Sequence, residues 1–160
     1  MKKLIILSDT HGKKDGVQSL MPRIAENDYV IHLGDGARET LDLLDSYPDK
    51  TYFCAGNCDF APHFPVDGVL EVENVRIYYC HGHTCGVKSS LGALVKAAKR
   101  NDCQVALYGH THSARIDEID GVTLICPGSL QRAVGQGGSY CYLVINGEKT
   151  TPVIVGESVF

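Results

Sequence analysis

The stretch KKLIILSDTH, at residues 2–11, is an apolar run that stops abruptly at a polar turn. A short run of this kind is typical of a strand that is buried on both faces. Residues 29–35, YVIHLGD, repeat the pattern, and TYFC at 51–54 begins a third run. We therefore expect strands at 2–7, 29–33 and 51–54, each followed by polar residues beside glycine.

Two amphipathic segments separate these strands. Residues 15–26 place apolar side chains at helical spacing, and residues 37–46 do the same before Tyr47-Pro48 ends the pattern. Pro22 lies inside the first segment, where it should kink the helix or mark a restart. Strands that alternate with helices in this way are typical of a layered α/β fold.

The second half of the chain predicts further strands and one helix. Asp120-Gly121 and Asn146-Gly147 each separate two apolar runs, which is the signal of a hairpin. A helix capped by Ser89 or Ser90 should run to Arg100. We expect strands at 68–72, 75–80, 104–108, 116–119, 122–125, 140–145 and 150–155. The pattern as a whole predicts two sheets stacked face to face, with helices outside.

The composition excludes several classes of protein. The chain has 160 residues, 44% hydrophobic and 21% charged, an ordinary balance for a single globular domain. A net charge of -4 argues against electrostatic capture of duplex nucleic acid or of an anionic membrane. No apolar run approaches the ~20 residues that span a bilayer. The N-terminal apolar run is too short for a signal peptide, so we expect a cytoplasmic protein.

The number and spacing of the cysteines also favour a cytoplasmic protein. The chain has seven cysteines, an odd number, and no CxxC pair, which argues against a disulfide framework or a structural zinc site. We expect them to be small buried side chains in a reducing compartment.

Polar side chains follow five of the expected strands, and the carboxyl ends of strands are where ligands bind in open α/β sheets. Carboxylate, imidazole and amide ligands together suit Mn, Fe, Co, Ni or Zn better than Mg or Ca. Seven candidate ligands are too many for one tetrahedral ion and fit two ions that share a carboxylate. Such a pair activates water and promotes in-line displacement at phosphorus. The candidates are Asp9, His11, Asp35, Asn57, His81, His110 and His112.

The segments Asp9-Thr10-His11, Gly34-Asp35, Gly56-Asn57, His81-Gly82 and Gly109-His110-Thr111-His112, in this order, resemble those of the calcineurin-like metallophosphoesterase superfamily. The resemblance covers residues 2 to about 145. Small size, Gly-Asn-Cys-Asp at 56–59 and Cys-Pro-Gly-Ser at 126–129 resemble the compact prokaryotic phosphodiesterase branch. The resemblance implies one metallophosphoesterase domain over residues 1–160, folded as a four-layer αββα sandwich of two mixed β-sheets flanked by helices.

The resemblance also implies a ligand set. One ion would be held by Asp9, His11, Asp35 and His112. The other would be held by Asp35, Asn57, His81 and His110. Asp35 would bridge the ions together with a hydroxide, which would attack phosphorus in line. Manganese is the first choice of metal, ahead of iron, cobalt, nickel and zinc.

The chain departs from this superfamily at two positions. Many members follow Gly-Asn with a histidine that is thought to protonate the leaving group, whereas this chain has Cys58. His83 is the best-placed substitute, so Asp35, Asn57 and His83 are the expected catalytic residues. Cys126 stands where relatives of this branch often have asparagine. Five residues stay open between a role at the site and a structural or solvent-exposed one: His32, Cys58, Asp59, His83 and Arg132.

The expected function is hydrolysis of small phosphodiesters, with monoesters as further substrates. The alternative is a non-catalytic protein-interaction scaffold, as in a eukaryotic retromer subunit of the same fold that has lost part of the ligand set. A protein phosphatase is a third option, but 160 residues leave little room for a peptide groove. The resemblance also suggests a homo-oligomer, often a dimer, and no duplex nucleic acid or membrane is expected as a partner.

Overall fold

The computed structural model describes residues 1–156. Its first sheet contains the three N-terminal strands, which run parallel to one another. These are β1 (Lys2–Leu7), β2 (Tyr29–His32) and β3 (Thr51–Phe53). The hairpin of β9 (Ser139–Asn146) and β10 (Lys149–Gly156) completes the sheet in the order β10-β9-β1-β2-β3, with β9 antiparallel to β1. The carboxyl ends of the three parallel strands therefore lie together at the same end of the sheet.

The second sheet has the order β4-β5-β6-β8-β7. Its central strands β5 (Val75–Cys80), β6 (Val105–Leu107) and β8 (Val122–Cys126) are parallel. The edge strands β4 (Asp67–Val72) and β7 (Arg115–Ile119) are antiparallel to their neighbours. The expected strands are thus present, with ends shifted by at most one residue.

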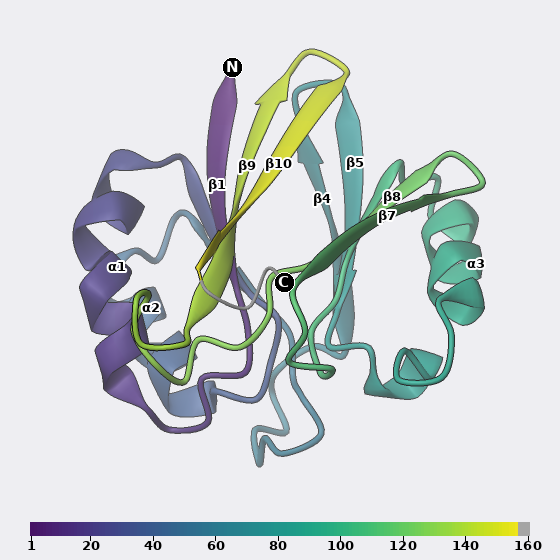
Figure 1. The fold of residues 1–160 in the computed structure, drawn as a ribbon. Helices are drawn as coiled ribbons and strands as arrows, with labels where there is room; N and C mark the ends of the chain where they lie inside the picture. The colour runs from purple at the N-terminus through teal and green to yellow at the C-terminus, as the bar shows by residue number, and fades with distance from the viewer. Residues whose placement is uncertain (157–160) are drawn as a thin grey trace.

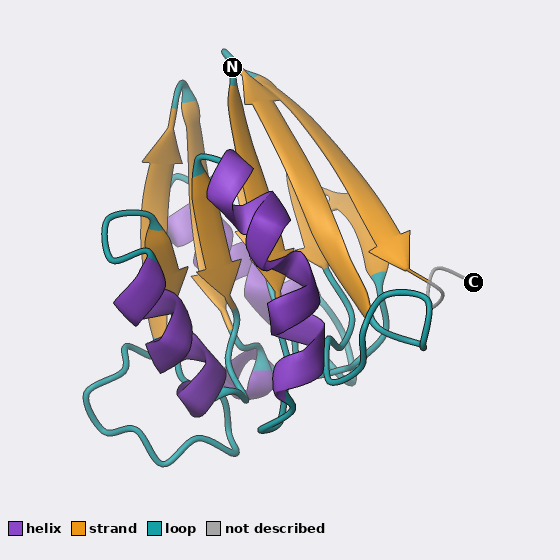
Figure 2. Ribbon diagram, turned by 90° about the vertical axis from the view of Figure 1, so that its left-hand side faces the viewer, coloured by secondary structure: helices purple, strands orange, loops and turns teal. Residues whose placement is uncertain are grey.

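Four layers result. Helices α1 (Lys14–Glu26) and α2 (Ala37–Ser46) cover the outer face of the first sheet, and α3 (Gly92–Arg100) covers that of the second (Figure 1 and Figure 2). The predicted αββα architecture is confirmed. Within residues 1–156, no helix is long and apolar enough to cross a membrane.

The strand β1 shows why the layers hold together. Leu4 and Ile6 point into the core between the sheets, whereas Ile5 and Leu7 pack against α1 and α2. All four are fully buried, as the run of apolar residues predicts. Each cysteine is unpaired and most are buried, in agreement with the expected small buried side chains.

The cap of the third helix needs correction, and only one of the two alternatives for Pro22 is excluded. The third helix begins at Gly92, because Leu91 is its N-terminal flanking residue and no side chain caps it, so neither Ser89 nor Ser90 has that role. Helix α1 runs through Pro22 without a restart, since Leu20 and Ile24 on either side are both buried against the sheet. Packing of the apolar face thus outweighs the loss of one helical hydrogen bond.

Candidate metal centre

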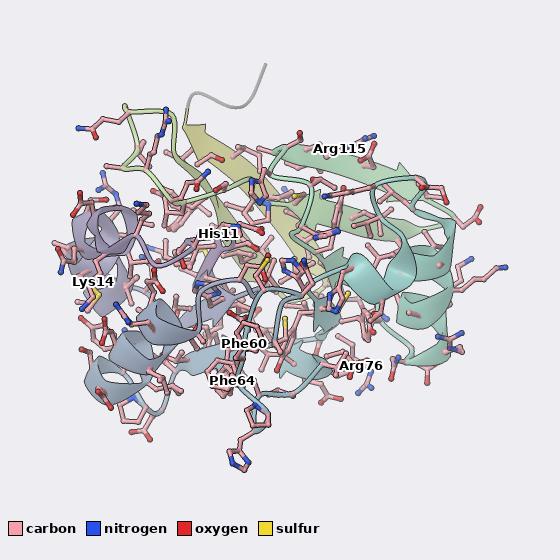
Figure 3. All side chains as sticks on the ribbon, turned by 90° about the horizontal axis from the view of Figure 1, so that it is seen from below. His11, Lys14, Phe60, Phe64, Arg76 and Arg115 are labelled. Carbon is pink, nitrogen blue, oxygen red and sulfur yellow. The ribbon has the colours of Figure 1, made fainter. Side chains whose placement is uncertain are left out.

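The five polar segments meet at the end of the molecule where β1, β2, β3, β5 and β6 finish, which is seen from below in Figure 3. Backbone hydrogen bonds tie the loops together. The Asp9 N–H donates to the Gly34 carbonyl at 3.0 Å, and the Gly109 N–H donates to the His81 carbonyl at 2.8 Å. The side chains of the loops are therefore held in fixed relative positions.

A first group consists of Asp9, His11 and His112. Asp9 Oδ1 lies 3.2 Å from His112 Nε2 and 3.6 Å from His11 Nε2, and the two Nε2 atoms are 3.2 Å apart. Ligand atoms about 2.1 Å from one ion are separated by about this much. Asp9 Oδ1 is buried without a hydrogen-bond partner among the described residues, so an acceptor is left facing two imidazoles. These residues fit a bound cation.

A second group consists of Asp35, His81 and His110, with Asn57 beside it. His81 Nδ1 donates to the Leu33 carbonyl at 2.7 Å, and Nε2 is 3.2 Å from Asp35 Oδ2 and 3.0 Å from Asn57 Oδ1. Burial lowers the pKa of His81, but Asp35 and Asp9 outweigh burial and raise it. The carboxylates near Nε2 therefore favour a positive charge at this position, either a proton on the ring or a cation bound beside it.

Asp35 joins the two groups. Its Oδ2 atom lies 3.8 Å from His11 Nε2 in the first group and 3.2 Å from His81 Nε2 in the second. Its Oδ1 atom accepts the Cys58 N–H at 2.8 Å. Burial raises the pKa of Asp35, yet hydrogen bonds from His81 and Cys58 hold it well below its ordinary value. The carboxylate is therefore ionised, with one oxygen directed between the groups.

Each group draws on both sheets. Asp9, His11 and Asp35 follow strands of the first sheet, whereas His81 and the His110–His112 segment follow strands of the second. The candidate centre thus lies across the junction of the two sheets.

The backbone at the candidate ligands is strained. A positive φ is uncommon outside glycine and costs about 1–3 kcal/mol, and such residues cluster at functional sites. A Cβ on Gly56 would lie 2.1 Å from Asp35 Oδ1, so this position also requires glycine for close approach. Five candidate ligands have φ between 50° and 72°: Asp9, His11, Asp35, His110 and His112.

A family model for the calcineurin-like phosphoesterase superfamily domain matches residues 1–148. The chain belongs to this superfamily. It is 32% identical over 151 residues to a probable metallophosphoesterase of Bacillus subtilis, covering 92% of this chain and 87% of the relative.

Solved structures share the phosphoesterase fold. A predicted phosphoesterase from Streptococcus pneumoniae superposes with a TM-score of 0.83 at 24% identity, over 97% of this chain and 89% of the other. Vacuolar Protein Sorting 29 from Cryptosporidium parvum gives a TM-score of 0.77 at 21% identity, over 98% of each chain. At these identities the likeness concerns the fold alone.

Asp59 supports the ligand loops of this phosphoesterase fold. Its Oδ2 accepts the N–H groups of Asp35 and Gly56, each at 2.8 Å, and its Oδ1 accepts those of Gly36 and Ala37 at 3.0 and 3.1 Å. One carboxylate thus fixes both the loop that carries Asp35 and the loop that carries Asn57. The sequence left the role of Asp59 open, and this geometry favours a positioning role.

Cys58 and His83 both lie beside the centre. Cys58 Sγ is within 4.8 Å of ligand atoms of His11 and Asp35, and burial and Asp35 raise its pKa, so that the thiol stays protonated. The ring centroid of His83 lies 5.4 Å from that of His81 and 6.1 Å from that of His110. Burial and His81 lower the pKa of His83.

Two further residues contact the ligand loops from β8 and the segment after it. The Ser129 hydroxyl donates to the Asp9 carbonyl at 2.8 Å, a contact that sequence reasoning missed because Pro127-Gly128 indicated only a turn. Cys126 is buried, with Sγ 3.5 Å from Thr111 Oγ1. The side chain of Arg132 lies near Gly137, in the loop before β9.

His32 lies beneath two ligand loops. Its Nδ1 accepts the Gly34 N–H at 3.1 Å, so Nε2 carries the proton and donates to Thr10 Oγ1 at 3.0 Å. Burial lowers the pKa of His32 from 6.5 to about 4, in spite of Asp59. His32 is therefore a satisfied core histidine, and its hydrogen bonds go to Thr10 and Gly34 rather than to a metal-binding carboxylate.

The buried His32 should make the fold sensitive to acid. Below pH 6.5 the unfolded chain binds a proton that the folded chain does not bind until about pH 4, so stability falls as the pH falls through this window. At pH 5.5 the loss is about 1.4 kcal/mol. Urea unfolding in chelator at pH 7.5 and 5.5 should show this loss, and His32→Gln should remove it. The exposed His63, changed to Gln, is the control; equal pH dependence in both variants would contradict the assignment.

Proposed function

We propose that this chain is a metal-dependent hydrolase of phosphodiesters, and of some monoesters, built as a single domain around a centre for two divalent ions. The observation that carries the proposal is the position of Asp35 Oδ2 between the two groups of ligand atoms. Membership of the calcineurin-like phosphoesterase superfamily supports the same chemistry. The preference for diesters rests on the segments at 56–59 and 126–129, which resemble the compact prokaryotic branch.

The two groups divide the ligands. Bound divalent ions would supply Lewis acidity, which activates water and stabilises charge on phosphoryl oxygens. Asp35 remains ionised and contributes to both positions. Asp9, His11 and His112 would complete the first position, and Asn57, His81 and His110 the second.

Hydrogen bonds prepare the chain for this role. The Leu33 carbonyl fixes the tautomer of His81 and thereby leaves Nε2 free as a ligand. Asn57 presents its Oδ1 atom to the same position. The ring of His83 lies 5.4 Å from that of His81, and we propose His83 as the candidate acid.

Metal analysis followed by kinetics tests the proposal. We expect about two divalent ions per chain, and hydrolysis of bis(4-nitrophenyl) phosphate to exceed that of 4-nitrophenyl phosphate. Titration with each of Mn, Fe, Co, Ni and Zn identifies the active metal. A metal-free preparation that gains no activity with any of these ions would refute an enzymatic role and favour the interaction scaffold.

The scaffold remains the second candidate because the fold also resembles that of Vacuolar Protein Sorting 29. The present chain, however, has a ligating side chain at all seven candidate positions. Six of them form two groups in which the ligand atoms lie within 4.8 Å of one another, and this grouping supports the enzyme.

The leaving group should matter strongly to the rate, because Cys58 replaces the histidine of many relatives. A positioned acid is worth ~10²–10⁴-fold. We expect aryl diesters to react much faster than alkyl diesters. His83→Ala should slow alkyl diesters selectively, and Cys58→His should speed them. Rates across a series of leaving groups provide the measurement; a flat series, unchanged in both variants with chemistry rate-limiting, would contradict both roles.

Removal of metal should lower stability without unfolding the chain. The three buried apolar clusters lie in the core between the sheets and beneath the helices, and they do not include the ligands. Metal at 100 times its dissociation constant adds about 2.7 kcal/mol. Chelator should therefore lower the melting temperature while far-UV circular dichroism at 25 °C is unchanged. Loss of secondary structure on chelation would contradict this expectation.

A further inference from the structure

A second cavity adjoins the loop that carries His110 and His112. Its volume is about 320 Å³, and it is separate in its lining from the cavity that His11 and Asp35 share. We call it the Lys88 cavity. It is lined by Val87, Lys88, Tyr108, Thr111, Ser113 and Arg115.

The lining is cationic and rich in hydroxyl groups. Lys88 is exposed and, within residues 1–156, forms no ion pair. Arg115, labelled in Figure 3, bonds Asp117 through Nε at 2.7 Å and Nη2 at 2.9 Å, which orients the guanidinium and leaves Nη1 available. The residues that line the cavity include no carboxylate. This charge distribution fits an anion.

Tyr108 supplies an independent observation. Its side chain is 1% exposed, and its hydroxyl has no hydrogen-bond partner among the described residues. A buried hydroxyl without a partner costs free energy, which a bound acceptor would recover. A phenol hydroxyl can donate to an anionic oxygen. The structure thus contains an unused donor on a residue that lines the cavity.

The cavity and the metal centre share one loop. Thr111 and Ser113 line the cavity, while their neighbours His110 and His112 belong to the two ligand groups. A group bound in the cavity would therefore lie next to a phosphoester at the centre.

We propose that the Lys88 cavity binds a second anionic group of the substrate, a phosphate or carboxylate close to the scissile phosphorus. The inference rests on the proposed function for the source of the anion, but the anion site itself does not depend on activity. It narrows the substrates to phosphoesters that carry an additional anionic group. Lys88 supplies the uncompensated charge, Arg115 supplies an oriented N–H donor from Nη1, and Tyr108 supplies a hydroxyl donor.

The first experiment measures anion binding without turnover. Sulfate is titrated into the Zn²⁺-loaded full chain, and amide shifts of Thr111 and Ser113 are followed by NMR. Lys88→Gln and Tyr108→Phe should each weaken sulfate binding, the former by about tenfold or more. Lys96→Gln, which removes an exposed lysine from α3, should bind sulfate as the parent does. Equal affinity in Lys88→Gln and Lys96→Gln, or no shift at these amides, overturns the site.

The second experiment identifies the source of the anion. Thymidine 5′-(4-nitrophenyl phosphate) and its 3′-phosphorylated counterpart share a leaving group and differ by one phosphate. We expect kcat/KM to be about tenfold higher for the 3′-phosphorylated ester. The ratio should fall towards one in Lys88→Gln and persist in Lys96→Gln. A ratio of one in the parent enzyme overturns the substrate assignment. Sulfate binding without hydrolysis of either ester refutes the proposed function and leaves the anion site standing.

Discussion

Replacement of Asp35 by Asn should remove most of the bound metal and nearly all phosphoester turnover. The carboxylate has two uses: Oδ1 accepts the Cys58 N–H, and Oδ2 lies between the ligand groups. An asparagine has one oxygen, so its amide would either leave the N–H unpaired or present a hydrogen-bond donor to the ions. We expect metal affinity and turnover each to fall by more than about a hundredfold. Removal of a residue that only supports a ligand costs at most about that much.

The measurement for Asp35→Asn is metal per chain after gel filtration, together with initial rates on an aryl diester. Asp45→Asn, at an exposed position on the same helix that follows Asp35, is the matched control and should keep both metal and rate. Retention of two ions and of full activity in Asp35→Asn would contradict the assignment of Asp35 as the ligand shared by both ions.

Asp59→Ala should have the second-largest effect, although Asp59 is in neither ligand group. Four backbone N–H groups lose their common acceptor, and the loops that carry Asp35 and Asn57 are released. We expect metal affinity to fall about 10–100-fold and the free energy of unfolding of the metal-free chain to fall by about 2–3 kcal/mol.

A graded series separates positioning from a merely structural role of Asp59. Asp59→Asn keeps one carbonyl oxygen and should give an intermediate metal affinity, and saturating metal should restore more of kcat in Asp59→Asn than in Asp59→Ala. The exposed Asp49, changed to Ala, serves as the control. Unchanged metal affinity in Asp59→Ala would exclude positioning, whatever the change in stability.

The strands and the candidate ligands could be predicted because their signals are local. The consecutive apolar residues of the run at 2–7 predict a strand that is buried on both faces, and Asp9 and His11 come shortly after it. The parallel strands then place their ends together without further information. The interpretation of Ser89 and Ser90 as caps was wrong because packing of Leu94 and Ala98 outweighs the ~1 kcal/mol that a capping side chain contributes.

Other features depend on contacts between distant segments. Asp59 is an ordinary turn residue in the sequence, and its four backbone partners are visible only when β2 and β3 end side by side. The donor of Tyr108 is similarly hidden, because an apolar strand end gives no sign that the hydroxyl lacks a partner. A positive φ at Asp9 or His112 has no sequence signal either, since neither is a glycine.

The location of the centre across two sheets has a thermodynamic consequence. Ions held by the proposed ligands of both sheets would resist any sliding of one sheet over the other, because such sliding would change the spacing of the ligands. Metal affinity and the packing of Leu4, Ile77 and Leu107 between the sheets are therefore linked quantities. Substitutions in this core, at positions that are not candidate ligands, would then tune the affinity for metal, and bound metal would in turn compensate for core substitutions.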